Sequence, residues 1–404
     1  MQDVAYLLEG GMGLGEDSPM RRIVPLAAVL IATGVSLGAC AAAPTVGQTT
    51  PPTPFAGMIL KLQMFGRSSG WATGVKPSGD AALLTTRDGG RTWSRRTPRQ
   101  LATVQRLSMD PSSPSAAWIA TVSRKGRVEA CHTESAGRDW RCHYVTSPTS
   151  GTDLSLWPSQ VDFVSPSTGW IELQQLTGRV SARAELWQTR DGGRTWHELF
   201  PLSYQAFGAA GPLTFSSANA GIHVVGYAYG YGNGVGAPGV YETTDGGRSW
   251  TVRYPPGQLS REDQQALPSH GMQAVTDEAR LWILRGGHVS PGLKLYDPLV
   301  DFYGAGRVVA ATGLASGPRD EALYFSDDAG QNWSRVSFAG SAIPKYFGPN
   351  WSYYLYQIDF VSPRIGFLLL NQEQVLKSLV FRTLDGGRSW SLVSGPDSAI
   401  PGAP

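Results

Sequence analysis

Three aspartates occupy matching places in short apolar segments, and they are the side chains best suited to acid–base chemistry. Asp162 and Asp359 open the sequence DFVSP, and Asp301 opens the related DFYGA. If these segments are the innermost strands of a closed ring, their carboxylates approach its central channel, where they could bind a cation or act as acid and base on a glycoside. The alternative is that each carboxylate is solvated or hydrogen-bonded in a structural role. We favour that alternative and predict no catalytic residue.

Two Cys-His pairs suggest a second kind of chemistry, a zinc site. Cys131-His132 and Cys142-His143 flank one degenerate copy of a repeated turn, so they should lie on two paired strands. Adjacent residues on a strand point to opposite faces, so these four side chains cannot converge on one ion. A disulfide needs only the two cysteines to face each other. We therefore predict that Cys131 pairs with Cys142, and we expect no metal and no cofactor.

The repeated turn is an octapeptide close to the form S/T-x-D-x-G-x-T/S-W. Good copies lie at 86–93, 189–196, 243–250, 326–333 and 383–390, and their aspartates are Asp88, Asp191, Asp245, Asp328 and Asp385. A sixth copy at 133–140 has Ser135 in place of the aspartate. Asp accepts backbone N–H groups inside a turn, Gly permits sharp bends, and the closing Trp packs beneath the hairpin. These aspartates are therefore predicted to be structural.

A second motif precedes most of these turns, as in DFVSPSTGW at 162–170 and MFGRSSGW at 64–71. An apolar segment, a Ser/Pro/Gly turn and another apolar segment indicate a hairpin. The two hairpins together make four strands, which is the unit of a β-propeller. A segment at 271–298 looks like a unit that lacks the octapeptide. We predict an all-β, seven-bladed propeller over 58–398 with blades starting near 58, 102, 159, 212, 271, 299 and 357; the alternative has six blades and a long insertion.

These two motifs in this order resemble the Asp-box, or bacterial neuraminidase, repeat. The arrangement is similar to the propellers of photosystem II stability/assembly factors and of the sortilin, sialidase and xyloglucanase-like group. The resemblance covers roughly 58–395 and implies the fold, but that fold carries many activities. Sialidases open with an F/Y-R-I-P motif. The nearest match here is Arg22-Ile23-Val24-Pro25, which lies before the propeller, so the resemblance does not imply sialidase activity.

The chain begins with features of export. Met20-Arg21-Arg22 precedes the apolar run 23–37, and Leu37-Gly38-Ala39-Cys40 resembles a lipobox. We predict that 1–39 is a signal peptide whose true start is Met20, because 1–19 carries four acids and no base. The resemblance implies that Cys40 is lipidated. Cys40 and the Pro/Thr-rich residues after it make up a predicted linker over 40–57. The protein should therefore lie outside the cytoplasm, anchored to the bacterial cytoplasmic membrane.

Two aromatic segments, at 226–239 and 344–357, should emerge on the propeller face opposite the Asp-box turns. Their candidate binding residues are Tyr227, Tyr229, Tyr231, Tyr346, Phe347, Trp351, Tyr353 and Tyr354. Exposed aromatic surfaces suit sugar rings or protein partners, although several of these rings could instead pack within their loops. Basic residues are scattered at a net charge of +2, which argues against nucleic acid. We predict a monomeric, non-catalytic protein that binds a glycan or a protein; the alternative is a glycoside hydrolase of xyloglucanase or sialidase type.

Overall fold

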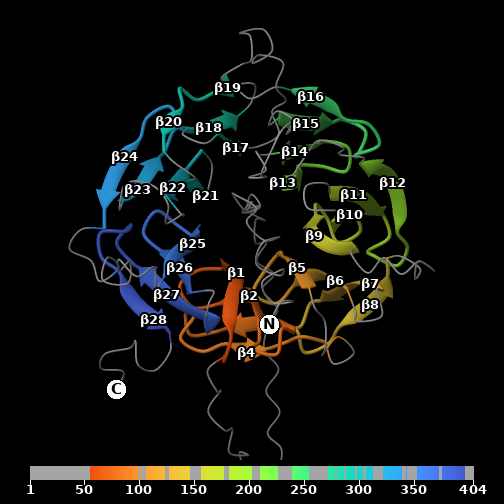
Figure 1. The fold of residues 1–404 in the computed structure, drawn as a ribbon, viewed down its shortest axis with the longest axis horizontal. Coiled ribbons are helices and arrows are strands. Elements are labelled where there is room, and N and C mark those ends of the chain that lie inside the picture. The colour runs from red at the N-terminus through yellow and green to blue at the C-terminus, as the bar shows by residue number, and fades with distance from the viewer. Residues whose placement is uncertain are drawn as a thin grey trace, which may run out of the picture.

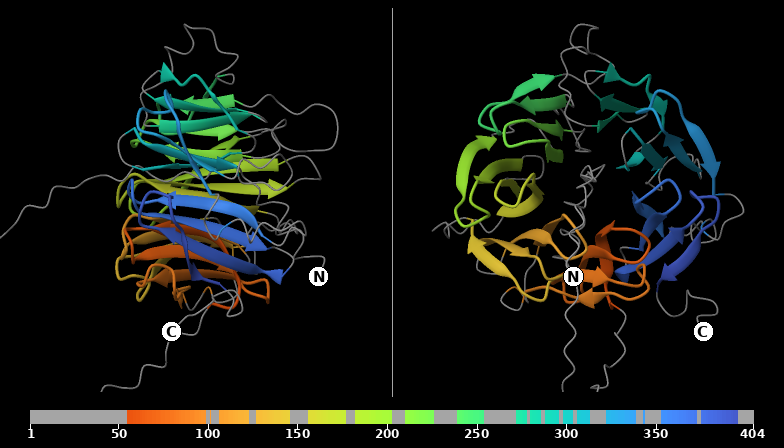
Figure 2. Two further views of the ribbon diagram at one scale, coloured as in Figure 1. Left: turned by 90° about the vertical axis from the view of Figure 1, so that its left-hand side faces the viewer. Right: turned by 180° about the vertical axis from the view of Figure 1, so that it is seen from behind.

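A computed structural model shows seven sheets arranged around a central axis (Figure 1; Figure 2). It describes residues 55–98, 101, 106–122, 127–145, 156–176, 182–202, 210–225, 239–253, 272–277, 280–285, 288–295, 298–303, 306–312, 322–338, 343, 353–372 and 375–395. All the regular elements among these residues are strands, apart from single residues in 3₁₀ conformation. None of the described segments forms a helix long and apolar enough to cross a membrane.

Consecutive strands build each blade, from the central axis outwards. Blades 1 to 3 consist of β1 (Met58–Met64), β2 (Gly70–Val75), β3 (Ala81–Thr86) and β4 (Ser94–Arg95); β5 (Arg106–Pro111), β6 (Ala117–Val122), β7 (Val128–Thr133) and β8 (Arg141–Tyr144); and β9 (Leu156–Phe163), β10 (Gly169–Leu176), β11 (Ala182–Thr189) and β12 (His197–Leu202). Blade 4 consists of β13 (Ala210–Phe215), β14 (Gly221–Val225), β15 (Gly239–Thr243) and β16 (Thr251–Arg253).

The remaining blades follow the same order around the ring. They consist of β17 (Met272–Asp277), β18 (Arg280–Arg285), β19 (His288–Val289) and β20 (Leu293–Lys294); β21 (Pro298–Phe302), β22 (Val308–Thr312), β23 (Ala322–Ser326) and β24 (Ser334–Ser337); and β25 (Tyr354–Phe360), β26 (Gly366–Gln372), β27 (Lys377–Thr383) and β28 (Ser391–Ser394). All pairings within a blade are antiparallel.

The seven-bladed prediction is confirmed, and the six-bladed alternative is wrong. The segment at 271–298, which has no Asp-box, forms a sheet of its own. This sheet, blade 5, differs from the others in how its last two strands pair. Both β19 and β20 pair with β18, whereas in the other blades the fourth strand pairs with the third. Without an Asp-box there is no turn to fold a fourth strand back on the third.

Burial is greatest in the second strand of a blade and least in the outermost strand, while the innermost strand is only partly buried, as in β5. Every residue of β2 and β6 is buried, because neighbouring blades cover both faces of these strands. The outermost strands β8 and β24 are mostly exposed. The hydrophobic core lies between blades: residues of β22 and β23 pack with residues of β25, β26 and β27 in one cluster. Each blade therefore depends on its neighbours for burial.

The ring closes between blade 7 and blade 1 without a shared strand. Side chains of blade 7 instead bond to the backbone of β1. Gln357 accepts the Leu62 N–H at 2.8 Å and donates to the Leu62 carbonyl at 2.7 Å. Asn371 Nδ2 donates to the Ile59 carbonyl at 2.9 Å, and Ser378 accepts the Ile59 N–H at 2.8 Å. These bonds give the closing seam a specific register.

The predicted leader 1–39, the lipidation site Cys40 and most of the linker lie outside the described residues, so these assignments stay predictions. The propeller itself begins with β1 at Met58, where the sequence places its start.

Candidate functional site

The three strand-borne aspartates that suggest acid–base chemistry bind backbone groups of the next blade. Asp162 accepts the Phe215 N–H at 2.5 Å, and Asp359 accepts the Met64 N–H at 2.7 Å. Asp301 accepts the Phe360 N–H in the same way. Asp301 and Asp359 are almost fully buried, with 1% and 2% of their surface exposed. Each carboxylate thus links the innermost strand of one blade to that of the next.

A fourth aspartate makes the same link, and sequence comparison could have found it. Asp110 lies in the sequence MDP of β5, which corresponds to VDF of β9, and it accepts the Phe163 N–H at 2.8 Å. Burial raises its pKa to about 6, against the opposing effects of that N–H and of Lys61.

Blade 1 shows why the position is not always Asp. Its equivalent residue is Gln63, and the facing residue in blade 2 is Pro111, which has no N–H to offer. Gln63 Nε2 instead donates to the Pro111 carbonyl at 3.3 Å. The residue type follows the hydrogen-bonding group opposite it, as expected of a structural contact between blades.

Aromatic stacking accompanies these links. The Trp170 ring lies 3.6 Å from the Phe215 ring at an interplanar angle of 1°, and Trp118 stacks on Phe163 at 3.9 Å. In both pairs a second-strand tryptophan covers the residue whose N–H the carboxylate binds. Carboxylate and stacked ring together fix the angle between neighbouring blades.

All five Asp-box aspartates form the predicted turn. Asp191 shows the pattern: Oδ1 accepts the Thr195 N–H at 3.0 Å, Oδ2 accepts the Thr195 hydroxyl at 2.6 Å, and Thr189 donates to Oδ1 at 2.9 Å. Such bonds lower the pKa of Asp191, Asp245, Asp328 and Asp385 to about 2. Four of the five good boxes have two glycines with positive φ, 73° and 76° at Gly192 and Gly193, and in the fifth Ala329 takes the first of these positions with φ 56°.

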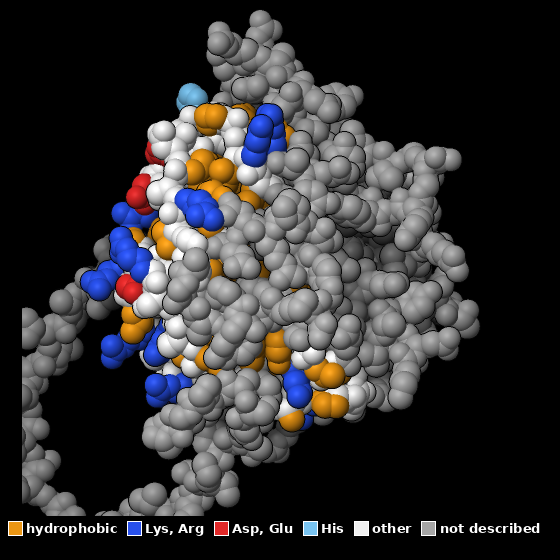
Figure 3. All heavy atoms as spheres, turned by 60° about the vertical axis from the view of Figure 1, so that its left-hand side comes forward, with side chains coloured by type: hydrophobic (Ala, Val, Ile, Leu, Met, Phe, Trp, Pro, Cys, Tyr) orange, Lys and Arg blue, Asp and Glu red, His pale blue; other side chains and the backbone are white. Residues whose placement is uncertain are grey.

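Each box turn also donates a backbone hydrogen bond to the turn between the first two strands of its blade. Gly192 N donates to the Ser167 carbonyl at 2.9 Å, and the other boxes make the equivalent bond. These two sets of turns therefore lie at the same end of the propeller. Figure 3 shows Lys and Arg side chains gathered along one margin of the described surface, with fewer acidic ones among them.

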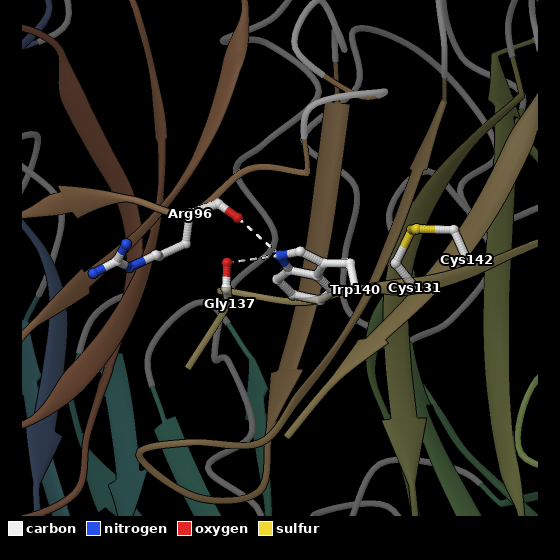
Figure 4. The surroundings of a disulfide bond; sticks show 5 residues. All are labelled: Arg96, Cys131, Gly137, Trp140 and Cys142. Atoms are coloured by element: carbon white, nitrogen blue, oxygen red, sulfur yellow. Dashed lines mark hydrogen bonds between the residues drawn. A yellow bond between two sulfur atoms is a disulfide. The ribbon is translucent and has the colours of Figure 1, made fainter. Parts of the chain in front are cut away.

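The Cys-His pairs do not form a metal site. Cys131 and Cys142 face each other on β7 and β8 and form a disulfide, as predicted (Figure 4). His132 instead stacks on Trp118, with ring centroids 4.2 Å apart. Within the described part of the chain, no group of three or more His, Cys, Asp or Glu side chains is placed to hold a metal ion.

A buried glutamate and a buried histidine lie close together between blades 3 and 4, and the sequence motifs do not predict this pair. Glu172 Oε1 lies 3.8 Å from His223 Nε2, and both side chains are fully buried. Ser159 donates to Glu172 Oε2 at 2.9 Å. Glu172 takes the place of Thr73 in β2 and Ala120 in β6, a substitution that the repeat alignment reveals.

Most of the predicted aromatic surface lies outside the described residues. This applies to Tyr227, Tyr229, Tyr231, Tyr346, Phe347 and Trp351. Tyr353 and Tyr354 are described and are partly buried at the start of β25; Tyr353 packs against the core, and the Tyr354 and Tyr356 rings lie 6.0 Å apart. Because β25 ends at its box-side turn, these tyrosines lie at the end opposite the Asp-boxes.

Comparisons with known proteins agree with this architecture. The model of the BNR/Asp-box repeat matches residues 324–335. No curated protein sequence matches the chain. The fold and its turns define a seven-bladed Asp-box β-propeller.

Several solved propellers are similar in fold. "YCF48 bound to D1 peptide" is 18% identical, with 83% of this chain and 94% of that chain covered and a TM-score of 0.49. YCF48 from Cyanidioschyzon merolae is 16% identical, with coverages of 80% and 95% and a TM-score of 0.45. The six-bladed fucose-recognising lectin of Aleuria aurantia is 11% identical, with coverages of 86% and 98% and a TM-score of 0.42.

Proposed function

We propose that this protein is a lipid-anchored, extracytoplasmic binding protein without catalytic chemistry. In this proposal it holds a glycan or a protein partner on the propeller face opposite the Asp-box turns. The observation that carries the proposal is the use of the strand aspartates: Asp162, Asp301 and Asp359 each accept a backbone N–H of the next blade. A carboxylate held in this way by a backbone donor and buried between blades is poorly placed to exchange protons with a substrate.

The disulfide supports the proposed compartment. Disulfides persist in oxidising surroundings and are rare in the reducing cytoplasm of most bacteria. Cys131 and Cys142 form one in β7 and β8, and the remaining cysteine of the chain, Cys40, is the one that the lipobox assigns to lipid. An exported, anchored protein accounts for all three.

The experiment that separates binding from catalysis uses Asp→Asn variants. Asn keeps an acceptor oxygen for the backbone N–H but cannot act as acid or base. We expect wild-type protein to release no sugar from xyloglucan or sialyllactose, and Asp359→Asn to melt close to wild type. Release of sugar that Asp359→Asn abolishes without lowering the melting temperature would establish the glycoside hydrolase alternative.

The anchoring part of the proposal is tested by cell fractionation. Cys40→Ser should move the protein from the membrane fraction to the medium, or leave the precursor unprocessed. A processed, membrane-bound Cys40→Ser protein would contradict lipidation. A glycan array and a pull-down from membranes, both with the mature protein, then identify the partner class.

A further inference from the structure

A hollow of about 270 Å³ lies where the third and fourth strands of blade 3 meet the box turn of blade 4. We call it the blade 3–4 pocket, and its lining consists of Gln188, Arg190, Asp191, Thr195, His197, Leu199 and Arg248. It lies at the box-turn end of the propeller, whereas the proposed function uses the opposite face. It is therefore separate from the binding face of the proposed function.

One side chain of the lining carries a buried donor that no described residue satisfies. Gln188 is only 3% exposed, and its Oε1 accepts a hydrogen bond from Arg190 Nε at 3.1 Å. That bond fixes which end of the amide is oxygen and which is nitrogen. Among the described residues, none offers an acceptor to the buried Gln188 Nε2. Almost none of the Nε2 surface is exposed, so a ligand in the pocket reaches this donor only if the Gln188 amide turns towards it.

The charges of the lining select the ligand. Arg190 and Arg248 approach from different blades, and both side chains are exposed at the pocket. Arg248 uses one N–H on the Asp245 carbonyl at 3.0 Å, which leaves the rest of its guanidinium for a ligand. Asp191 stays ionised because its turn holds its pKa at about 2. The two arginines and the one aspartate of the lining sum to a single formal positive charge.

We propose that the blade 3–4 pocket binds a small molecule or group that carries one carboxylate. A carboxylate has a single negative charge, which matches the lining, whereas a phosphomonoester carries about 1.5 to 2 at neutral pH. Guanidinium forks pair well with planar carboxylates, and Arg190 and Arg248 bring two of them to the pocket. The volume suits one sugar acid or one N-acylated amino acid, and Leu199 offers the only aliphatic side chain of the lining for its carbon skeleton.

The test is calorimetric titration of the mature protein with four probes: D-glucuronate, N-acetyl-L-glutamine, D-glucose and inorganic phosphate. We expect at least one of the two carboxylates to bind, and whichever binds more tightly identifies a sugar acid or an amino acid as the source. Glucose and phosphate should bind more weakly than that carboxylate. No binding of either carboxylate at millimolar concentration would overturn the proposal, as would tighter binding of phosphate or glucose.

A matched pair of variants places the binding in this pocket. Arg388 holds the box position equivalent to Arg248 and donates to the Asp385 carbonyl at 3.1 Å, but it does not line the pocket. Arg248→Gln should weaken carboxylate binding about tenfold, the loss of one charged hydrogen bond, while Arg388→Gln leaves it within about twofold. Equal effects of the two variants would show that the carboxylate responds to general surface charge, and the pocket assignment would then be wrong.

Discussion

Blades 2 and 3 are neighbours in the ring, yet their third and fourth strands are joined by different chemistry. In blade 3 the Asp191 carboxylate organises the turn through Thr195 and Thr189. In blade 2 the corresponding residue is Ser135, which keeps a single strong contact, from the Asp139 N–H at 2.8 Å. Blade 2 therefore lacks the hydrogen bond that the Thr195 hydroxyl donates to the Asp191 carboxylate in blade 3, because its seventh box residue is Asp139.

Blade 2 has a covalent bond where the other boxes have a charged turn. The disulfide joins β7 and β8 just beyond the weakened turn, and Trp140 donates to both the Gly137 and the Arg96 carbonyls, at 3.1 and 3.0 Å (Figure 4). In blade 3, Trp196 donates to Gly193 alone among the described contacts. The same hairpin is therefore stabilised by a charged turn in blade 3 and by a disulfide in blade 2. Each of these interactions can be removed by mutation without changing the other.

Removing the disulfide should have the largest effect. Cys131→Ala with Cys142→Ala should lower the free energy of unfolding by about 2–3 kcal/mol, because the unfolded chain regains the freedom of a short loop. Urea unfolding with and without a reductant measures the same quantity on wild type. Unchanged stability, or free thiols at both cysteines in peptide maps of exported protein, would contradict the comparison.

Removing one charged turn should have the next largest effect. Asp88→Ala leaves the Thr92 N–H and hydroxyl without their acceptors at 2.9 and 2.6 Å and should cost about 1–2 kcal/mol. Asp88→Asn is the control, since its amide oxygen can still accept the Thr92 N–H. If the Ala variant unfolds at the same urea concentration as wild type, the box aspartates do not support the turns as described.

Acid should weaken the charged turns and spare the turn of blade 2. In the folded protein the pKa of four box aspartates is about 2, below the ordinary value of 3.8. At a pH between about 2 and 4 the unfolded chain therefore binds more protons than the folded one. The free energy of unfolding then falls as the pH drops from about 4 towards 2. The effect per turn is small because these carboxylates face solvent. Melting temperatures across this range should show a shallower decline for Asp385→Asn than for wild type.

Restoring the charged turn in blade 2 should have the smallest effect. Ser135→Asp alone places a carboxylate beside Asp139, so we expect no gain. Ser135→Asp with Asp139→Thr recreates the common box and should recover about 0.5–1 kcal/mol in the protein that lacks the disulfide. A single variant as stable as the double one would show that the seventh position does not matter.

The repeats made the blades predictable, because turn and strand residues recur in each of them. Contacts between blades were harder to predict, since they pair residues about 50 positions apart, as in Asp162 with Phe215. Pro111 explains Gln63 only once the two strands are known to face each other. The blade 3–4 pocket was missed for the same reason, because Gln188 and Arg248 come from different blades, and Arg248 occupies a common box position.

The central claim is that the repeated charged residues hold the fold while a separate surface binds the partner. Its most direct test compares Asp88→Ala with the double variant Trp351→Ala/Tyr229→Ala, measuring both melting temperature and capture of the partner identified by array or pull-down. We predict that Asp88→Ala lowers the melting temperature and keeps binding, and that the double variant keeps the melting temperature and loses binding. If the double variant unfolds, or if Asp88→Ala loses binding while it stays folded, the claim is wrong.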